Sequence, residues 1–156
     1  LVSKEKQNQR KILNRRARYD YEIQSQIEAG IVLNGSEVKS IRLGKVVLDN
    51  SYAVFKKGEL WILNLYIDLK NLNKKLENID NLRPKKLLLS RKELNKISST
   101  VLNNNLTIVP LNLHFNNKGF IKIDLGISKG RKKSDKREYK KDQDWKREKE
   151  RLLKKI

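Results

Sequence analysis

Apolar and polar residues alternate most regularly in the last third of the chain. Every second residue from Ile121 to Ile127 is apolar, and this period of two predicts a strand with one buried and one solvated face. A similar run covers 111–115, and the polar residues 116–119 between the two runs predict a turn. Pro110, just before the first run, predicts a bulge or an edge position, because proline cannot donate to a sheet ladder.

The middle of the chain predicts a β-hairpin. Residues 51–55 and 59–67 are rich in apolar and aromatic residues and flank a turn at Lys57-Gly58. Within 59–67, one face would carry Leu60, Ile62, Asn64 and Tyr66. We predict that the other face points into the core: Trp61, Leu63, Leu65 and Ile67.

Shorter runs predict three more strands, over 19–23, 31–34 and 87–89. Two short helices are expected as well. Ser36 can cap the first helix, which Gly44 would end. The second helix follows Ser90 and Glu93, whose S-x-x-E spacing is that of a capping box, and it should run to about Ser99, with Leu94 and Ile97 on its apolar face.

This order of elements predicts a mainly β fold with short helices. Strands do not alternate with long helices, so a small antiparallel β-barrel of the oligonucleotide-binding type fits better than an α/β sheet. The barrel domain should span 19–128, after a basic flexible arm over 1–18. Residues 68–86 are rich in Asn and Lys and predict a loop or an insert within the domain.

The last segment, 129–156, is a basic tail. It holds 14 Lys and Arg against 6 Asp and Glu, with few large apolar residues. A helix that is polar nearly all round has no face to pack. We therefore expect the tail to be disordered alone and to fold on a partner.

The overall charge points to a polyanionic partner. Among 156 residues, 37 Lys and Arg oppose 18 Asp and Glu, which gives a net charge of +19. Nucleic acid is the first candidate. A membrane surface is the second, although no apolar run approaches the roughly 18 residues that a spanning helix needs. The basic residues gather in four clusters: Arg15, Arg16 and Arg18; Lys39, Arg42 and Lys45; Arg83, Lys85 and Lys86; and the run from Lys129 to Lys141.

The composition argues against catalysis. The chain has no Cys, which excludes a thiolate nucleophile and a Cys-based zinc site. Its one His, His114, lies in an alternating run and is best interpreted as a strand residue. No acidic cluster has the spacing of a metal site, so we predict no metal, no cofactor and no enzymatic activity.

Several segments, in this order and spacing, resemble the SsrA-binding protein (small protein B, SmpB) family, whose partner is transfer-messenger RNA (tmRNA). They are NRRARYDYEI, IEAGIVLNGSEVKSIRLGK, SYAVFKKGELWILN, KKLLLSRKEL, LTIVPLNLHF, IKIDLGISKGRK and DKRE. The resemblance implies a barrel that binds the tRNA-like domain of tmRNA. It also implies a tail that folds as a helix in the decoding centre and mRNA channel of a stalled ribosome, during trans-translation. Such a protein would be a monomer and would catalyse no reaction itself.

The resemblance also assigns residues. On the RNA-binding face it implies Glu28, Lys39, Arg42, Lys45 and Lys122. In the ribosome-binding tail it implies Gly130, Lys132, Asp135, Lys136, Arg137 and Trp145. Asp135 would lie near the N-terminus of the tail helix, where a negative charge is favourable. Ser134 departs from the family, which often has His or Tyr there.

Two alternatives remain open at this stage. The protein could be a basic ribosomal or ribosome-assembly protein, or its charge could be a generic solvated surface. The family acts in the bacterial cytoplasm. A plastid or the mitochondrial matrix is the alternative location if the chain, which has no Met, was processed from a longer precursor.

Overall fold

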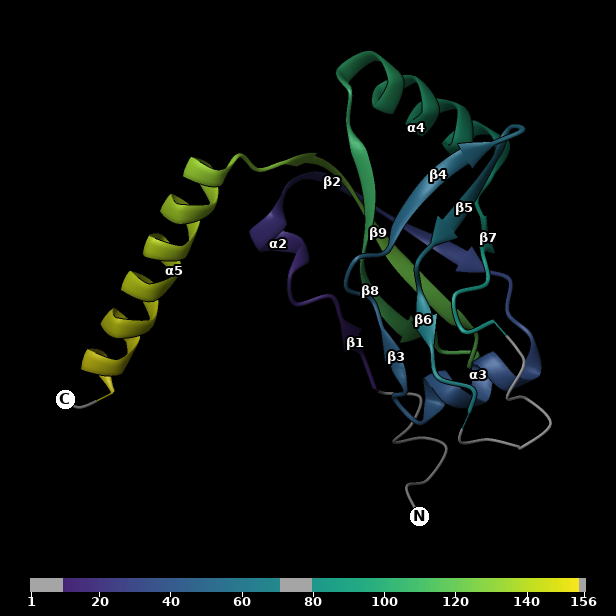
Figure 1. Ribbon diagram of the computed structural model, residues 1–156, viewed down its shortest axis with the longest axis horizontal. Coiled ribbons are helices and arrows are strands. Elements are labelled where there is room, and N and C mark those ends of the chain that lie inside the picture. The colour runs from purple at the N-terminus through teal and green to yellow at the C-terminus, as the bar shows by residue number, and fades with distance from the viewer. Residues whose placement is uncertain (1–9, 71–79, 155–156) are drawn as a thin grey trace.

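The computed structural model describes residues 10–70 and 80–154. It is mainly β with short helices and one long helix that projects from the body (Figure 1). The strands are β1 (Ile12–Leu13), β2 (Tyr21–Ile31), β3 (Val46–Val47), β4 (Tyr52–Lys56), β5 (Glu59–Leu63), β6 (Tyr66–Ile67), β7 (Lys85–Leu88), β8 (Thr107–Phe115) and β9 (Ile121–Gly130). The helices are α2 (Ala17–Asp20), α3 (Gly35–Arg42), α4 (Arg91–Asn104) and α5 (Lys133–Leu153).

The main sheet closes on itself. Its order is β1-β8-β4-β5-β7-β2-β9, and β8 also pairs with β9. The pairings are antiparallel, and β1 lies beside the last part of β8. This ring of strands is consistent with the predicted small barrel of the oligonucleotide-binding type. In Figure 1, α4 lies at one end of the ring and α3 lies at the other.

The predicted alternation and turns are largely confirmed. Ile123, Leu125 and Ile127 are buried in the core, and β4 and β5 form the hairpin around Lys57-Gly58. The register between β8 and β9 shifts between Pro110 and Asn112, so the predicted irregularity is present. The core cluster draws on strands β2 to β9 and on the helices α3 and α4.

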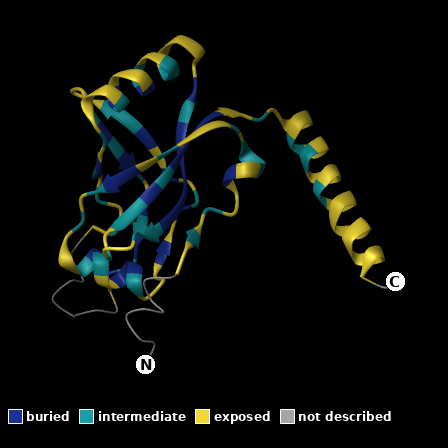
Figure 2. Ribbon diagram, turned by 180° about the vertical axis from the view of Figure 1, so that it is seen from behind, coloured by how far each residue is buried: buried dark blue, intermediate teal, exposed yellow. Residues whose placement is uncertain are grey.

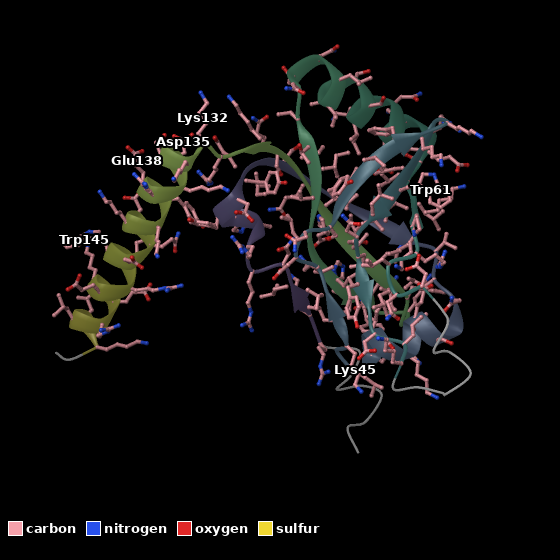
Figure 3. The ribbon with its side chains drawn as sticks, viewed as in Figure 1. Lys45, Trp61, Lys132, Asp135, Glu138 and Trp145 are labelled. Carbon is pink, nitrogen blue, oxygen red and sulfur yellow. The ribbon has the colours of Figure 1, made fainter. Side chains whose placement is uncertain are left out.

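The predicted core face of 59–67 is half wrong. Leu60 and Ile62 are fully buried, and Trp61 lies on the outer side of β5 (Figure 3). The strand ends at Leu63, and Asn64 adopts a left-handed backbone with φ 59°. This turn reverses the alternation, so Leu65 and Ile67 are buried as predicted. Sequence alternation alone cannot reveal such a change of phase.

The N-terminal elements also differ from the prediction. Residues 21–31 form one continuous strand, β2, rather than two, and 17–20 form the short helix α2. Residues 12–13, expected in a flexible arm, pair with β8, while residues 1–9 lie outside the described part. Beneath α2, a small apolar cluster joins Ala17 to Val109 and Leu111. This cluster covers part of the β9 face that alternation predicted to be solvated.

Both predicted helices are present, but their ends differ. Asn34, not Ser36, caps α3, and it forms a capping box with Glu37. Ser90 caps α4 as predicted, and Leu94 and Ile97 are its buried residues. The helix continues past Ser99 to Asn104, where Asn105 ends it in a left-handed conformation.

A charge network around the buried Glu37 carboxylate links α3 to Arg83 and to Lys85, the first residue of β7. The Glu37 carboxylate is 2.5 Å from Arg83 Nη2 and 3.7 Å from Lys85 Nζ. Lys85 is fully buried and donates to the carbonyl oxygens of Leu65 and Arg83. Burial lowers the pKa of Lys85, and Glu37 offsets part of that shift. The prediction that Lys85 belongs to a phosphate-binding cluster is therefore wrong, because its side chain is fully buried, whereas Arg83 keeps 38% of its side chain exposed.

We expect Glu37→Gln to lower the free energy of unfolding by about 3–5 kcal/mol, since it leaves Lys85 buried without its carboxylate. Glutamine can still complete the capping box, so the loss would report the charge. Urea denaturation measures it. The control is Glu59→Gln, which breaks the more exposed pair with Lys86 (3.0 Å) and should cost less than about 1 kcal/mol. Equal losses would contradict the assignment.

Candidate nucleic-acid interface

The predicted tail is the helix α5. Its 21 residues include no buried one (Figure 2), in keeping with the lack of an apolar face in the sequence. Gly130 ends β9, Lys132 is the N-cap of α5, and Asp135 lies in the first turn, where its charge complements the helix dipole. Lys136 is half-buried. Within the described residues, no helix is long and apolar enough to cross a membrane.

The other residues predicted for the ribosome-binding tail are exposed on α5. Arg137 is exposed, and Trp145 keeps 66% of its surface exposed. Lys132 and Asp135 lie at the start of the helix, and Trp145 lies further along it (Figure 3). A tryptophan with so little protein contact is available to a partner, and its ring can stack on a base.

Arg131 fixes the junction between the body and α5. Its backbone N–H donates to the Asp20 carbonyl oxygen at 2.9 Å, and its Nε donates to the Arg18 carbonyl oxygen at 3.1 Å. Its guanidinium lies 4.5 Å from the centre of the Tyr139 ring. Arg131 thus ties β9, α2 and the second turn of α5 together.

Lys136 makes a second link to the same short helix. Its Nζ is 3.3 Å from Asp20 Oδ1 and 5.8 Å from the centre of the Tyr19 ring. Asp20 also pairs with Arg16, at 3.6 Å. Only the first turns of α5 make these contacts, so most of the helix remains accessible.

A basic cavity of about 500 Å³ lies between the NRRAR segment and α5. Its lining holds five cationic side chains and one carboxylate. It is formed by Arg15, Arg16, Arg18, Tyr19, Tyr139, Lys140, Gln143, Asp144 and Arg147. Cations gathered in this way repel one another and favour a polyanion, such as a phosphodiester chain.

Glu28 and Lys122 lie on one face of the sheet. In the β2–β9 ladder, Glu28 is opposite Asp124 and Gly30 is opposite Lys122. Glu28 and Lys122 are therefore diagonal neighbours, and their side chains point away from the core residues Ala29 and Ile123. The structure brings these two predicted RNA-binding residues together.

The other three predicted RNA-binding residues lie elsewhere. Lys39 and Arg42 are in the last turn of α3, and Lys45 is exposed just beyond it, at the α3 end of the ring (Figure 3). Arg42 Nε is buried and makes no hydrogen bond to the described residues. These cations flank the end of the ring rather than the β2–β9 face itself.

Three polar residues beside Glu28 were not predicted as site residues. His114 lies between Glu28 and Asn112, with its Nε2 3.1 Å from Glu28 Oε2 and its Nδ1 2.8 Å from Asn112 Oδ1. Asn112 Nδ2 in turn donates to Asp124 Oδ2 at 2.9 Å. His114 is on a strand, as predicted, but it is also part of this network. In the sequence, the signal for this network was the set of polar residues that alternate with apolar ones in β8 and β9. Only the register between the strands shows that these polar residues meet.

Glu28, His114 and Asp124 place their ligating atoms within 4.8 Å of one another. The two ring nitrogens point at different partners, and both are already hydrogen-bonded. We therefore interpret the group as a hydrogen-bond network and assign no metal to it.

A closed ring of strands with a polar strand face, a basic cavity and an exposed basic helix defines a class of small nucleic-acid-binding proteins. The family model described as "SmpB protein" matches residues 11–155. The chain belongs to this family.

Similar proteins cover most of the chain. An SsrA-binding protein of Jannaschia sp. is 48% identical over 90% of this chain and 89% of its own length. That of Azorhizobium caulinodans is 43% identical over 96% and 94%. A solved structure named "tmRNA-SmpB: a journey to the center of the bacterial ribosome" contains a chain with 44% identity and a TM-score of 0.66, which covers 82% of this chain and 92% of the other.

Proposed function

We propose that the protein binds the tRNA-like domain of tmRNA and delivers it to stalled ribosomes for trans-translation. The observation that carries this proposal is the family match, which runs from the start of β1 through the tail. The solved structure named for tmRNA and SmpB on the ribosome supports the same partners. The protein acts by binding, as a monomer without a cofactor, and its place of action is the bacterial cytoplasm, where the ribosomes are.

The body and the tail have separate roles in this proposal. Glu28 and Lys122 on the β2–β9 face contact the tRNA-like domain, and Lys39, Arg42 and Lys45 contact its phosphates from the α3 end. Lys and Arg supply affinity through phosphate. The Glu28 carboxylate accepts from a base amino group or a 2′-hydroxyl, and so contributes specificity.

The tail enters the decoding centre and the mRNA channel. Gly130 and Lys132 form the exit from the body, and Asp135, Lys136 and Arg137 lie in the first turns of α5. Trp145 meets the ribosome further along the helix. The exposure of α5 along its length supports this role. That the tail is disordered until it is bound stays a prediction.

Competition binding tests the proposed partner. We expect the protein to prefer the tRNA-like domain of tmRNA over bulk tRNA at near-physiological salt, because the β2–β9 face offers acceptors as well as cations. Filter binding or fluorescence anisotropy with unlabelled tRNA as competitor measures the preference. Equal, steeply salt-dependent binding to both RNAs would contradict the proposal and favour a general ribosomal component.

Removing α5 separates the two roles. A chain that ends at Lys132 keeps β9 and the backbone contacts of Arg131, so its affinity for the tRNA-like domain should stay within about threefold of the full chain, a small change in binding free energy. Its activity in a reconstituted trans-translation assay should be lost. If affinity and rescue fell together, the body and the tail would not have separate roles.

Lys122→Ala should weaken binding to the tRNA-like domain and lower the slope of log K against log salt by roughly one unit, as expected for one lost phosphate contact. Lys96→Ala, an exposed change on α4, removes the same charge away from the face and should leave the slope unchanged. Identical slopes for Lys122→Ala and the wild type would exclude a phosphate contact at Lys122.

A further inference from the structure

The polar network beside Glu28 has a fixed direction of hydrogen bonding. Asn112 is 7% exposed, and its Nδ2 donates to Asp124 Oδ2 at 2.9 Å. Turning the amide round would place its oxygen against an ionised carboxylate, where neither group can donate. The amide oxygen, Oδ1, therefore faces His114, and His114 Nδ1, at 2.8 Å, has to be the donor.

The other ring nitrogen also faces an acceptor. His114 Nε2 is 3.1 Å from Glu28 Oε2, and an ionised carboxylate only accepts. A neutral imidazole has one donor and one acceptor nitrogen, whereas the protonated ring has two donors. The network is fully satisfied when both nitrogens of His114 carry a proton.

Charged groups of both signs surround the ring. Glu28 and Asp124 are directly opposite in the β2–β9 ladder, an arrangement that destabilises a sheet when both charges have the same sign. The ring contacts both, since its Nδ1 is 3.8 Å from Asp124 Oδ2. Cations also lie nearby. Lys122 is opposite His114 in the β8–β9 ladder. Lys11, Arg15 and Arg18 line a cavity that Asn112 and Asp124 also line.

We propose that His114 is a positioning residue for RNA binding, whose doubly protonated ring holds the Glu28 carboxylate in one orientation. Glu28 is 54% exposed, so it would otherwise sample several rotamers. With Oε2 held by the ring, Oε1 makes no hydrogen bond to the described residues and is free to accept from RNA. The positive ring also lowers the negative potential that two facing carboxylates would present to phosphate. This inference rests on the proposed role of Glu28.

The protonation state is tested without RNA. In a long-range ¹H–¹⁵N spectrum of the full chain at about pH 6, where histidine is able to change charge, both His114 nitrogens should have the shifts of protonated nitrogen. A neutral ring in the wild type at about pH 6 would overturn the proposal whether or not the chain binds tmRNA.

The positioning role is tested with the tRNA-like domain. His114→Phe, which keeps a ring but no donor, should weaken binding roughly tenfold, the equivalent of one lost hydrogen bond to a charged group. His114→Gln, which can still donate to Glu28, should recover part of that loss. The control Glu22→Gln changes an exposed carboxylate on the same strand and should bind as the wild type does.

A double-mutant cycle tests whether His114 acts through Glu28. His114→Phe should have little further effect in a Glu28→Ala background, because there is no carboxylate left to orient. Fully additive losses would overturn the positioning role. Thermal melts of each variant show whether a loss of binding reflects unfolding. If the wild type itself showed no preference for the tRNA-like domain, the proposed function would fail, while the spectrum would still decide the state of the ring.

Discussion

The antiparallel pairing of β2 with β9 is the interaction on which the rest of the molecule depends. It runs from Tyr21 opposite Gly130 to Gly30 opposite Lys122, and it closes the ring of strands. At one end it places Glu28, Lys122 and Asp124 on one solvated face. At the other end it brings the exit of the tail beside α2, where Arg131 and Lys136 can reach Asp20. The same ladder therefore sets both candidate surfaces and their separation.

The positive charges have three different uses in the fold. Lys85 and the partly exposed Arg83 pair with buried Glu37, and breaking this network would leave a buried charge unpaired. Arg131 and Lys136 hold the base of α5 to the body through contacts with α2 at the surface. Five further cations line the cavity beside α5, together with the Asp144 carboxylate, and others are exposed on α3, β9 and α5. Net charge alone does not distinguish these uses, but burial does.

An RNA-binding surface of cations alone would bind any phosphate chain. The β2–β9 face instead mixes a lysine with two carboxylates, a histidine and an amide, all on three neighbouring strands. The acidic residues of such a face weaken its attraction for phosphate. Their oxygens accept hydrogen bonds in fixed directions, which a donor on the RNA has to match. A chain of hydrogen bonds links Asp124, Asn112, His114 and Glu28 on this face.

Local patterns in the sequence determined much of this protein. Alternation, turn residues and the Ser90 cap predicted the strands β4, β5, β8 and β9, the turns between them and the start of α4, because these features depend on neighbours only a few residues away. The lack of an apolar stripe predicted a tail that is disordered alone and folds on a partner; the structure has 133–153 as the helix α5, with no buried residue.

Only the tertiary structure decided which distant residues meet. The backbone at Asn64 changed which residues of 59–67 are buried. Asn34 caps the helix that Ser36 was expected to cap, and Glu37 pairs with the buried Lys85. The register of three strands placed His114 between Glu28 and Asn112. Contacts between residues 28 and 114 depend on pairing across the ring, and no pattern of neighbours along the chain encodes that register.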